Sequence, residues 1–327
     1  MKAFRHKNAR TVKEAVTLLQ QSAGKALPIA GGSDLLGEMK DFIETPDLLV
    51  NLKAIPGLNK IEQKGGTISI GALVTIADLA ESSLVRTQLA AVAEAAVVIA
   101  SPQIRNAGTV GGNLCQRPRC WYYRSEFQCL RKGGTICYAA AGENRYHAIL
   151  GGGPSFIVHP SDLAPPLIAL DAKARIAGPS GERTILLEQF FVLPTVNVRR
   201  ENILKPGEIL TEIQVPVPQN GTRSTYWKQM EREMWDFALV SAAVVVRQSN
   251  GPQGKVISHA RVVLGGVAPI PWRSKEAEAA LIGKPLDQAN AALAAEEALK
   301  PAQPLRDNAF KVDLTKAVLR GAILRLA

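Results

Sequence analysis

The chain has 327 residues, of which 46% are hydrophobic and 5% aromatic, and it carries a formal net charge of +10 at pH 7. This length is enough for two or three domains with separate cores. No apolar run reaches the roughly 18 residues that a membrane-spanning helix needs, so the sequence predicts no membrane span. The positive charge would suit nucleic acid or an acidic protein, but the few aromatic residues leave few platforms for stacking on single strands.

The first predicted elements surround a Gly-Gly turn. Residues 11–14 form a capping box, which predicts a helix ending near Gln21. Residues 27–30 predict a short apolar strand that leads through the sequence Gly-Gly-Ser-Asp into a helix beginning at Leu35. Such a turn lets main-chain N–H groups approach a phosphate, because glycine has no Cβ atom. By itself the turn is weak evidence, since most glycine pairs only connect elements and the chain contains neither G-x-G-x-x-G nor a Walker A motif.

The next elements are of mixed type and end at a second glycine-rich loop. Residues 48–52 and 67–74 predict strands, whereas residues 75–78 and 84–99 predict helices. Residues 103–113 then form the glycine-rich loop, which leads directly to the first cysteine of the chain. The order of elements indicates a protein with both helices and sheets.

All four cysteines of the chain, Cys115, Cys120, Cys129 and Cys137, lie within 23 residues. Disulfide bridges would need an oxidising compartment, and the N-terminus shows no apolar segment or cleavage site of a secretory signal. A zinc site usually has C-x2-4-C pairs, a spacing that only Cys115 and Cys120 approach. An iron-sulfur cluster tolerates a wider loop, so the spacing favours a cluster over the other two interpretations.

Basic side chains surround these thiols. The segment has a single acidic residue, Glu126, against five basic residues: Arg117, Arg119, Arg124, Arg131 and Lys132. A four-thiolate cluster is a net anion, and nearby cations would offset its charge. The same side chains would also be compatible with a solvated basic face.

A predicted strand at residues 156–159 ends at His159, which could be a ligand but is better explained as a structural histidine. Ser161 or Asp162 is expected to cap the helix that follows. The remaining predicted elements are a hairpin around 178–181, a strand at 209–215, a linker at 216–221, strands at 224–230, 237–246 and 256–264, and helices at 275–281, 287–299 and 313–326.

Five segments, taken together and in order, resemble the FAD-binding medium subunit of the molybdenum hydroxylases, the group that includes xanthine dehydrogenases, carbon monoxide dehydrogenase and aldehyde oxidoreductases. They are residues 29–35, 105–114, 161–162, 226–229 and 264–268. The resemblance implies an α+β protein with a two-subdomain FAD-binding fold of the vanillyl-alcohol-oxidase (PCMH) type. It also implies a C-terminal α+β domain with a three-stranded antiparallel sheet and helices.

The implied domain limits are 1–218 for FAD binding, with subdomains of about 1–55 and 56–218, and 219–327 for the C-terminal domain. In the family, the second glycine loop and the Ser-Asp pair lie close together, whereas here an insertion at about 115–158 separates them. The insertion is similar to the extra [4Fe-4S] segment of the flavin subunits of 4-hydroxybenzoyl-CoA reductase and, more closely, the periplasmic aldehyde oxidoreductase.

The resemblance also implies the roles of individual residues. The first wall around FAD would be Ile29, Ala30, Gly31, Gly32, Ser33, Asp34 and Leu35, and the second wall Gly108, Thr109, Gly112 and Asn113. Ser161 and Asp162 would contact the flavin nucleotide, with Leu210 and Lys228 at its border. The ligands of a [4Fe-4S] cluster would be Cys115, Cys120, Cys129 and Cys137.

The function implied is that of an electron-transfer flavoprotein subunit without a substrate hydroxylation site. Its partners would be a large molybdenum-cofactor subunit and a small [2Fe-2S] subunit, and its FAD would pass electrons to an external acceptor. The chain would be made in the cytoplasm, or reach the periplasm with a partner that carries a twin-arginine signal. A basic nucleic-acid-binding protein with a zinc or iron-sulfur module, and a stand-alone flavin oxidase, are the alternative functions.

Overall fold

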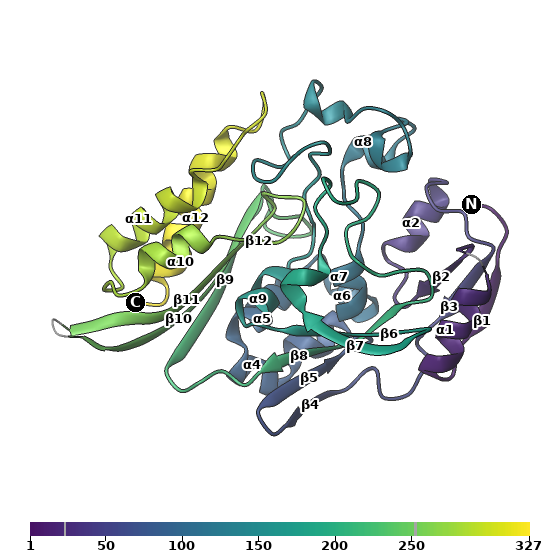
Figure 1. Ribbon diagram of the computed structural model, residues 1–327, viewed down its shortest axis with the longest axis horizontal. Helices are drawn as coiled ribbons and strands as arrows, with labels where there is room; N and C mark the ends of the chain where they lie inside the picture. Colours follow the sequence, from purple (N-terminus) through teal and green to yellow (C-terminus); the bar gives the residue numbers. More distant parts are fainter. Residues whose placement is uncertain (23, 252–253) are drawn as a thin grey trace.

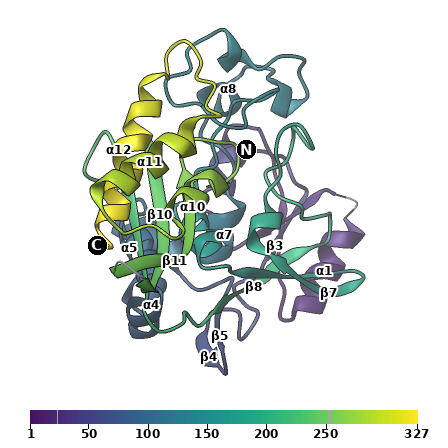
Figure 2. The same ribbon diagram turned by 60° about the vertical axis from the view of Figure 1, so that its left-hand side comes forward.

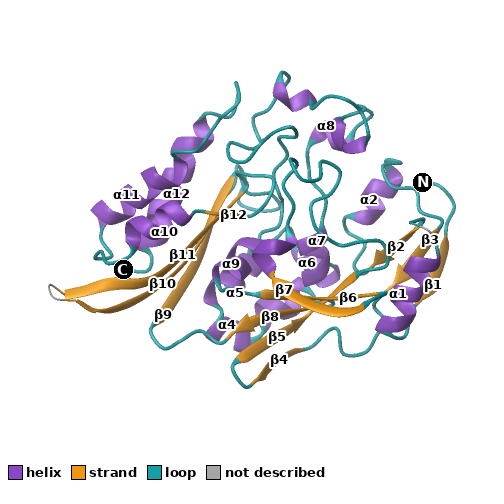
Figure 3. Cartoon of the chain, viewed as in Figure 1, coloured by secondary structure: helices purple, strands orange, loops and turns teal. Residues whose placement is uncertain are grey.

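A computed structural model describes residues 1–22, 24–251 and 254–327 and contains three β-sheets with helices packed on them (Figures 1 and 3). The mixed α and β composition and the separate C-terminal antiparallel sheet agree with the predicted fold class. None of the helices in the described ranges combines the length and the apolar character that crossing a lipid bilayer requires.

The N-terminal sheet is parallel, with strand order β1-β3-β2. Its elements are β1 (Arg5–Asn8), α1 (Val12–Gln21), β2 (Ala26–Ile29), α2 (Leu35–Lys40) and β3 (Leu48–Asn51). Helix α1 begins as predicted, because the Thr11 hydroxyl accepts a hydrogen bond from the Glu14 N–H. The Gly-Gly turn therefore lies at the carboxyl end of β2, where the chain enters α2.

The middle sheet is antiparallel, with strand order β4-β5-β8-β6-β7. Its strands are β4 (Ile61–Lys64), β5 (Thr67–Gly71), β6 (Lys173–Gly178), β7 (Gly181–Leu186) and β8 (Ile209–Pro216). The predicted hairpin at 178–181 is confirmed, since Gly178 pairs with Gly181 at the turn between β6 and β7. Strands β5 and β8 pair although more than a hundred residues separate them, so this sheet joins two distant parts of the chain.

Helices pack on this sheet over the segment that joins β5 to β6. They are α3 (Ile76–Glu81), α4 (Ser83–Gln88), α5 (Ala90–Val97), α6 (Pro102–Ala107), α7 (Val110–Cys115) and α9 (Ala164–Ala169). The single helix predicted at 84–99 is wrong, because the chain breaks at Leu89, which has φ −129° and ψ 53°. Leu89 is fully buried, and the break allows α4 and α5 to turn their apolar sides toward one core.

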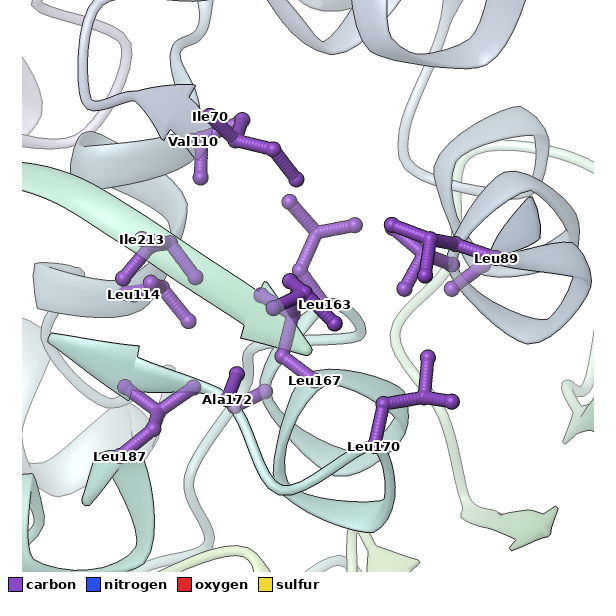
Figure 4. Packing of buried hydrophobic residues seen from close by; sticks show 14 of the residues in the cluster. Ile70, Leu89, Val110, Leu114, Leu163, Leu167, Leu170, Ala172, Leu187 and Ile213 are labelled. Atoms are coloured by element: carbon purple, nitrogen blue, oxygen red, sulfur yellow. The ribbon is translucent and has the colours of Figure 1, made fainter. Parts of the chain in front are cut away.

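That core fixes the position of α7. Figure 4 shows Ile70 of β5, Ile213 of β8, Leu114 of α7 and Leu167 of α9 in one packed cluster, and all four side chains are fully buried. Removing a leucine from such a cluster typically costs about 2–5 kcal/mol. The glycine loop before α7 is therefore attached to a rigid support.

The C-terminal sheet has strand order β12-β11-β10-β9 and is antiparallel. Its strands are β9 (Thr222–Gln229), β10 (Val240–Gly251), β11 (Gly254–Gly265) and β12 (Trp272–Arg273). Helices α10 (Lys275–Leu281), α11 (Gln288–Leu299) and α12 (Phe310–Leu324) cover one of its faces (Figures 1 and 2). The prediction of three strands is wrong, because β12 adds a fourth that is too short to leave a periodic signal.

Residues 115–158, all of which the structure describes, contain no β-strand and only short helical turns: α8 (Trp121–Arg124), η1 (Leu130–Lys132) and η2 (Tyr138–Ala140). The segment lies on the same side of the sheets as α2 (Figure 1). The strand predicted at 156–159 is also wrong, because this extended stretch joins no sheet. Single main-chain bonds hold it, from Ala148 N to Phe156 O and from His159 N to Ala268 O.

Residues of the C-terminal domain bind the insertion around His147. The fully buried Lys311 of α12 donates hydrogen bonds to the carbonyls of His147 (3.1 Å) and Gly266. Asn308 donates a further bond to the His147 carbonyl at 3.1 Å. The insertion is therefore fixed to the C-terminal domain through its main chain.

Candidate functional site

A groove of about 480 Å³ lies between the two glycine loops. The turn after β2 and the loop between α6 and α7 supply its two walls. Twelve of the predicted FAD-binding residues line it: Ile29, Ala30, Gly31, Gly32, Ser33, Asp34, Leu35, Gly108, Thr109, Gly112, Asn113 and Asp162. The structure thus brings together two loops that are more than seventy residues apart.

Glycine is required where the two walls touch. A Cβ atom on Gly31 would lie 2.0 Å from the carbonyl oxygen of Ala107, so only glycine permits this approach. Gly32 has φ +71°, a left-handed conformation that glycine adopts without strain. The walls of the groove are consequently main chain at this point, which fits the binding of an anionic pyrophosphate by backbone N–H groups.

Hydrogen bonds to neighbouring elements hold the second wall of the groove in place. The Thr109 hydroxyl accepts a hydrogen bond from Gly112 N–H (3.1 Å) and caps α7. Main-chain bonds from Val110 N to Val74 O (2.9 Å) and from Ile76 N to Gly108 O (2.9 Å) connect this loop to the end of β5 and the start of α3. The wall is therefore preformed rather than dependent on a ligand.

Asp34 connects the first wall to the insertion. One of its carboxylate oxygens accepts bonds from Arg119 (2.8 Å) and Arg124 (2.8 Å), and the other accepts the main-chain N–H of Arg117 (2.8 Å). Arg117 and Arg119 also line the groove. The insertion thus supplies two cations to a groove whose lining also includes the acidic residues Asp34, Glu38, Glu44, Asp162 and Asp236.

A buried ion pair lies at one end of the groove. Lys228 Nζ is 3.0 Å from Asp162 Oδ2 and also donates to the carbonyls of Val98 and Asp236. Tyr226 donates its hydroxyl proton to Asp162 Oδ1 at 2.6 Å, and burial together with this carboxylate raises the pKa of Tyr226 well above its usual value. Lys228 itself does not line the groove in the described part of the chain but holds Asp162, which does.

The two remaining predicted residues have different surroundings. Ser161 donates its hydroxyl proton to Asn113 Oδ1 (2.6 Å) and accepts the Ala164 N–H at the start of α9. The N-cap residue of α9 is Leu163, so the predicted cap at Ser161 or Asp162 is wrong. Leu210 is buried in β8 and packs in the main core, and it is not among the described residues that line the groove.

Several groove residues were not predicted. The loop after β9 supplies Trp235, Asp236 and Phe237, and the insertion supplies Arg117 and Arg119. A second cavity of about 380 Å³ adjoins the groove, since Arg119, Asp162, Asp236 and Phe237 line both. No local sequence signal marks these residues. An exposed Trp235 with φ +50° becomes recognisable as a groove residue only in the folded chain.

The four cysteines do not share one site. Cys120, Cys129 and Cys137 line a single small cavity with Ser155, and each of the three directly precedes a short helical turn. Cys115 instead ends α7, packs against the main core and lines the groove. The small cavity is narrow, about 10 Å³, so its loops must move apart to admit a cluster.

A cationic side chain lines the cavity of the three thiols. Arg131 lies there and is paired with the buried Glu201, while its buried Nε has no hydrogen-bond partner among the described residues. His147 Nε2 lies 3.2 Å from Cys120 Sγ, and burial, with the charge of Lys311, lowers the pKa of His147 to about 4, so its ring is neutral. Burial raises the pKa of Cys120 to about 11, although N–H groups of the following turn oppose this shift. Three of the four predicted ligands therefore line one cavity, and Cys115 lies outside it.

His159 has the surroundings of a structural histidine. Its Nδ1 accepts the Ser161 N–H, its ring contacts Phe191 edge-on, and burial lowers its pKa to about 3. Within the described residues, no group of three or more His, Cys, Asp and Glu side chains is placed to hold a metal ion. The possible ligand role of His159 thus has no support in the geometry.

Two family models cover nearly the whole chain. The FAD binding domain in molybdopterin dehydrogenase matches residues 2–218, and the CO dehydrogenase flavoprotein C-terminal domain matches residues 225–326. The chain is 37% identical to the aldehyde oxidoreductase FAD-binding subunit PaoB of Escherichia coli, over 99% of this chain and 98% of that one. It is 31% identical to the carbon monoxide dehydrogenase medium chain of Hydrogenophaga pseudoflava, over 98% and 96%.

The fold agrees with these matches. The solved carbon monoxide dehydrogenase of Hydrogenophaga pseudoflava superposes with a TM-score of 0.77 at 30% identity and covers 98% of this chain and 96% of its own. A solved Cu,Mo-CO dehydrogenase gives a TM-score of 0.79 at 27% identity, over 100% and 98%. The chain is therefore an FAD-binding oxidoreductase subunit and belongs to the family of FAD-binding medium subunits of molybdenum hydroxylases.

Proposed function

We propose that this chain is the electron-transfer flavoprotein subunit of a molybdenum hydroxylase complex of the aldehyde or xanthine type. Electrons would come from [2Fe-2S] clusters of a small partner subunit and pass through FAD to an external acceptor. The substrate would be hydroxylated on a large molybdenum-cofactor subunit. The groove between the two glycine loops carries the proposal, because its preformed main-chain walls fit a dinucleotide and the whole chain matches medium subunits. The likeness to an aldehyde oxidoreductase subunit favours an aldehyde substrate.

Bound FAD would supply two-electron chemistry that no side chain can provide. The chain's own contribution is binding and electrostatics. Backbone N–H groups around Gly31 and Gly32 would bind the pyrophosphate, with Arg117 and Arg119 providing positive charge. Lys228 would act through Asp162, whose carboxylate it holds at the groove for a contact with the flavin nucleotide.

The insertion would hold a [4Fe-4S] cluster on the thiols that face its cavity. The cluster would either exchange electrons with FAD, as a relay, or hold the fold of the insertion together, as a structural clamp. The proximity of Cys120 to the groove supports a relay, because Arg119, its neighbour in the chain, lines the groove. The many attachments of the insertion, at Asp34 and at Lys311, support a clamp.

The assembled complex would lie in the cytoplasm, or in the periplasm if a partner carries a twin-arginine signal.

Anaerobically purified protein should show flavin absorption bands over a broad iron-sulfur background, with about one FAD per chain. The measurement is a visible spectrum before and after reduction, with flavin and iron assayed on the same sample. Protein without flavin would contradict the proposed function and, if its DNA affinity fell steeply with salt, would support the nucleic-acid alternative. Flavin without iron would preserve the flavin function and remove the cluster.

A Cys129→Ser variant should lose iron, because this buried thiol lines the cavity. If the cluster is a relay, reduction of FAD by the partner subunits should become slower in this variant. An unchanged rate of FAD reduction, in a variant that has lost its iron, would contradict the relay and leave the clamp.

A further inference from the structure

We infer that the cluster site of this chain consists of three thiolates, Cys120, Cys129 and Cys137, with the hydroxyl of Ser155 at the fourth position. Cys115 is a thiol of the flavin groove and not a ligand. This inference rests on the cluster in the proposed function and changes one of the four ligands that the sequence predicted.

Cys115 cannot reach the other thiols without loss of structure. It is the last residue of α7, and its neighbour Leu114 is fully buried in the main core. Gln116 closes the end of the helix by donating from its side-chain amide to the Asn113 carbonyl at 2.9 Å. To move Cys115 into the thiol cavity, the last turn of α7 would have to unwind and Leu114 would have to leave the core.

The residues between Cys115 and Cys120 are fixed as well. The main-chain N–H of Arg117 and the guanidinium of Arg119 both bind the carboxylate of Asp34, at 2.8 Å each. Arg117 also pairs with the buried Glu201 at 2.7 Å. These contacts hold Arg117 and Arg119 in place, so a fixed segment of the chain separates Cys115 from Cys120.

Ser155 is the candidate for the fourth ligand. It is 1% exposed and lines the same cavity as the three thiols. The main-chain bonds of the neighbouring Phe156 and His159 hold its segment in place. The four side chains come from four separate segments, as expected of a site that encloses a compact cluster from several sides.

A serine oxygen would change the chemistry of the one iron of the cluster that it binds. Iron-sulfur clusters favour soft thiolate ligands, and an oxygen donor is harder and binds that iron less firmly. One iron of the cluster would then be more exposed to chelators than the other three. Replacing Ser155 by cysteine should convert the site to four thiolates and remove that difference.

The experiment compares the full chain with Ser155→Cys, Cys115→Ser and Cys129→Ser variants, all purified anaerobically. We measure iron and flavin per chain, the rate of iron loss to an added chelator, and the electron paramagnetic resonance spectrum after reduction. The expected result is that Cys115→Ser retains the iron content of the parent and Cys129→Ser loses it. Ser155→Cys should lose iron severalfold more slowly than the parent and show an altered resonance spectrum.

Loss of iron in Cys115→Ser, or identical iron loss and spectra for Ser155→Cys and the parent, would overturn this inference. Parent protein with flavin and no iron would also overturn it and leave the flavin function intact. Parent protein without flavin would contradict the proposed function itself, so the two failures are distinguishable. Circular dichroism of each variant shows whether an iron loss comes from unfolding.

Discussion

A Gly31→Ala variant is expected to fold but to lose most of its FAD. The added Cβ atom would lie 2.0 Å from the Ala107 carbonyl oxygen, so the two walls of the groove would have to move apart by about 1 Å to reach even a 3.0 Å contact. Main-chain donors around Gly31 and Gly32 on the first wall would then miss the pyrophosphate. Losing two charge-assisted hydrogen bonds of about 1.5–3 kcal/mol each would weaken FAD binding by more than about 100-fold.

The measurement is the amount of FAD released per chain on denaturation, together with the dissociation constant of added FAD. Gly37→Ala is a matched control, because a Cβ atom at Gly37 in α2 would meet no atom within 4 Å. It should keep its FAD and stabilise α2 slightly, since alanine favours a helix more than glycine does. Full FAD occupancy in Gly31→Ala would show that the approach of the two loops is not required for binding.

A Lys228→Met variant is expected to lower the free energy of unfolding by about 3–5 kcal/mol. The Lys228 side chain is 1% exposed and is 3.0 Å from Asp162, whose own side chain is 7% exposed. Methionine would fill a similar volume but, among the residues that the structure describes, would leave the buried carboxylate with only the Tyr226 hydroxyl as partner. Urea unfolding followed by circular dichroism measures the loss, and Lys255→Met, at an exposed position in β11, should change little.

The double variant Asp162→Asn/Lys228→Met tests whether the loss comes from the unpaired charge. With both charges removed, its free energy of unfolding should exceed that of Lys228→Met alone. Equal losses in the single and double variants would mean that Lys228 acts through packing and not through its pairing with Asp162. Both variants should also bind FAD less well, since Asp162 lines the groove.

The parts of the fold and of the groove that have local signals were predictable from sequence. A capping residue such as Thr11, and glycines at a strand-to-helix turn, mark a conformation through contacts within a few residues. The break at Leu89 leaves no such mark, because every residue around it is compatible with a continuous apolar helix. Only packing against the core decides that the chain turns there.

The cysteines and the arginines show what could not be predicted from local sequence signals. Cys115 and Cys120 are five residues apart, and spacing alone made them one site, but the end of α7 lies between them. Arg119 is one of 39 basic residues, and only its contact with Asp34 places it at the groove. Lys228 was identified through family resemblance, since nothing in its local sequence indicates a buried ion pair.

The hydrogen bond from Ser161 to Asn113 also bears on how such a subunit could evolve. It joins the residues on either side of the insertion at 2.6 Å, so the chain leaves the flavin domain and returns to it at one point. A segment that departs and rejoins at a single point can be gained or lost by an ancestral gene without displacing the strands around it. The thiol-bearing segment therefore has the geometry of an accessory module inserted into a flavin domain.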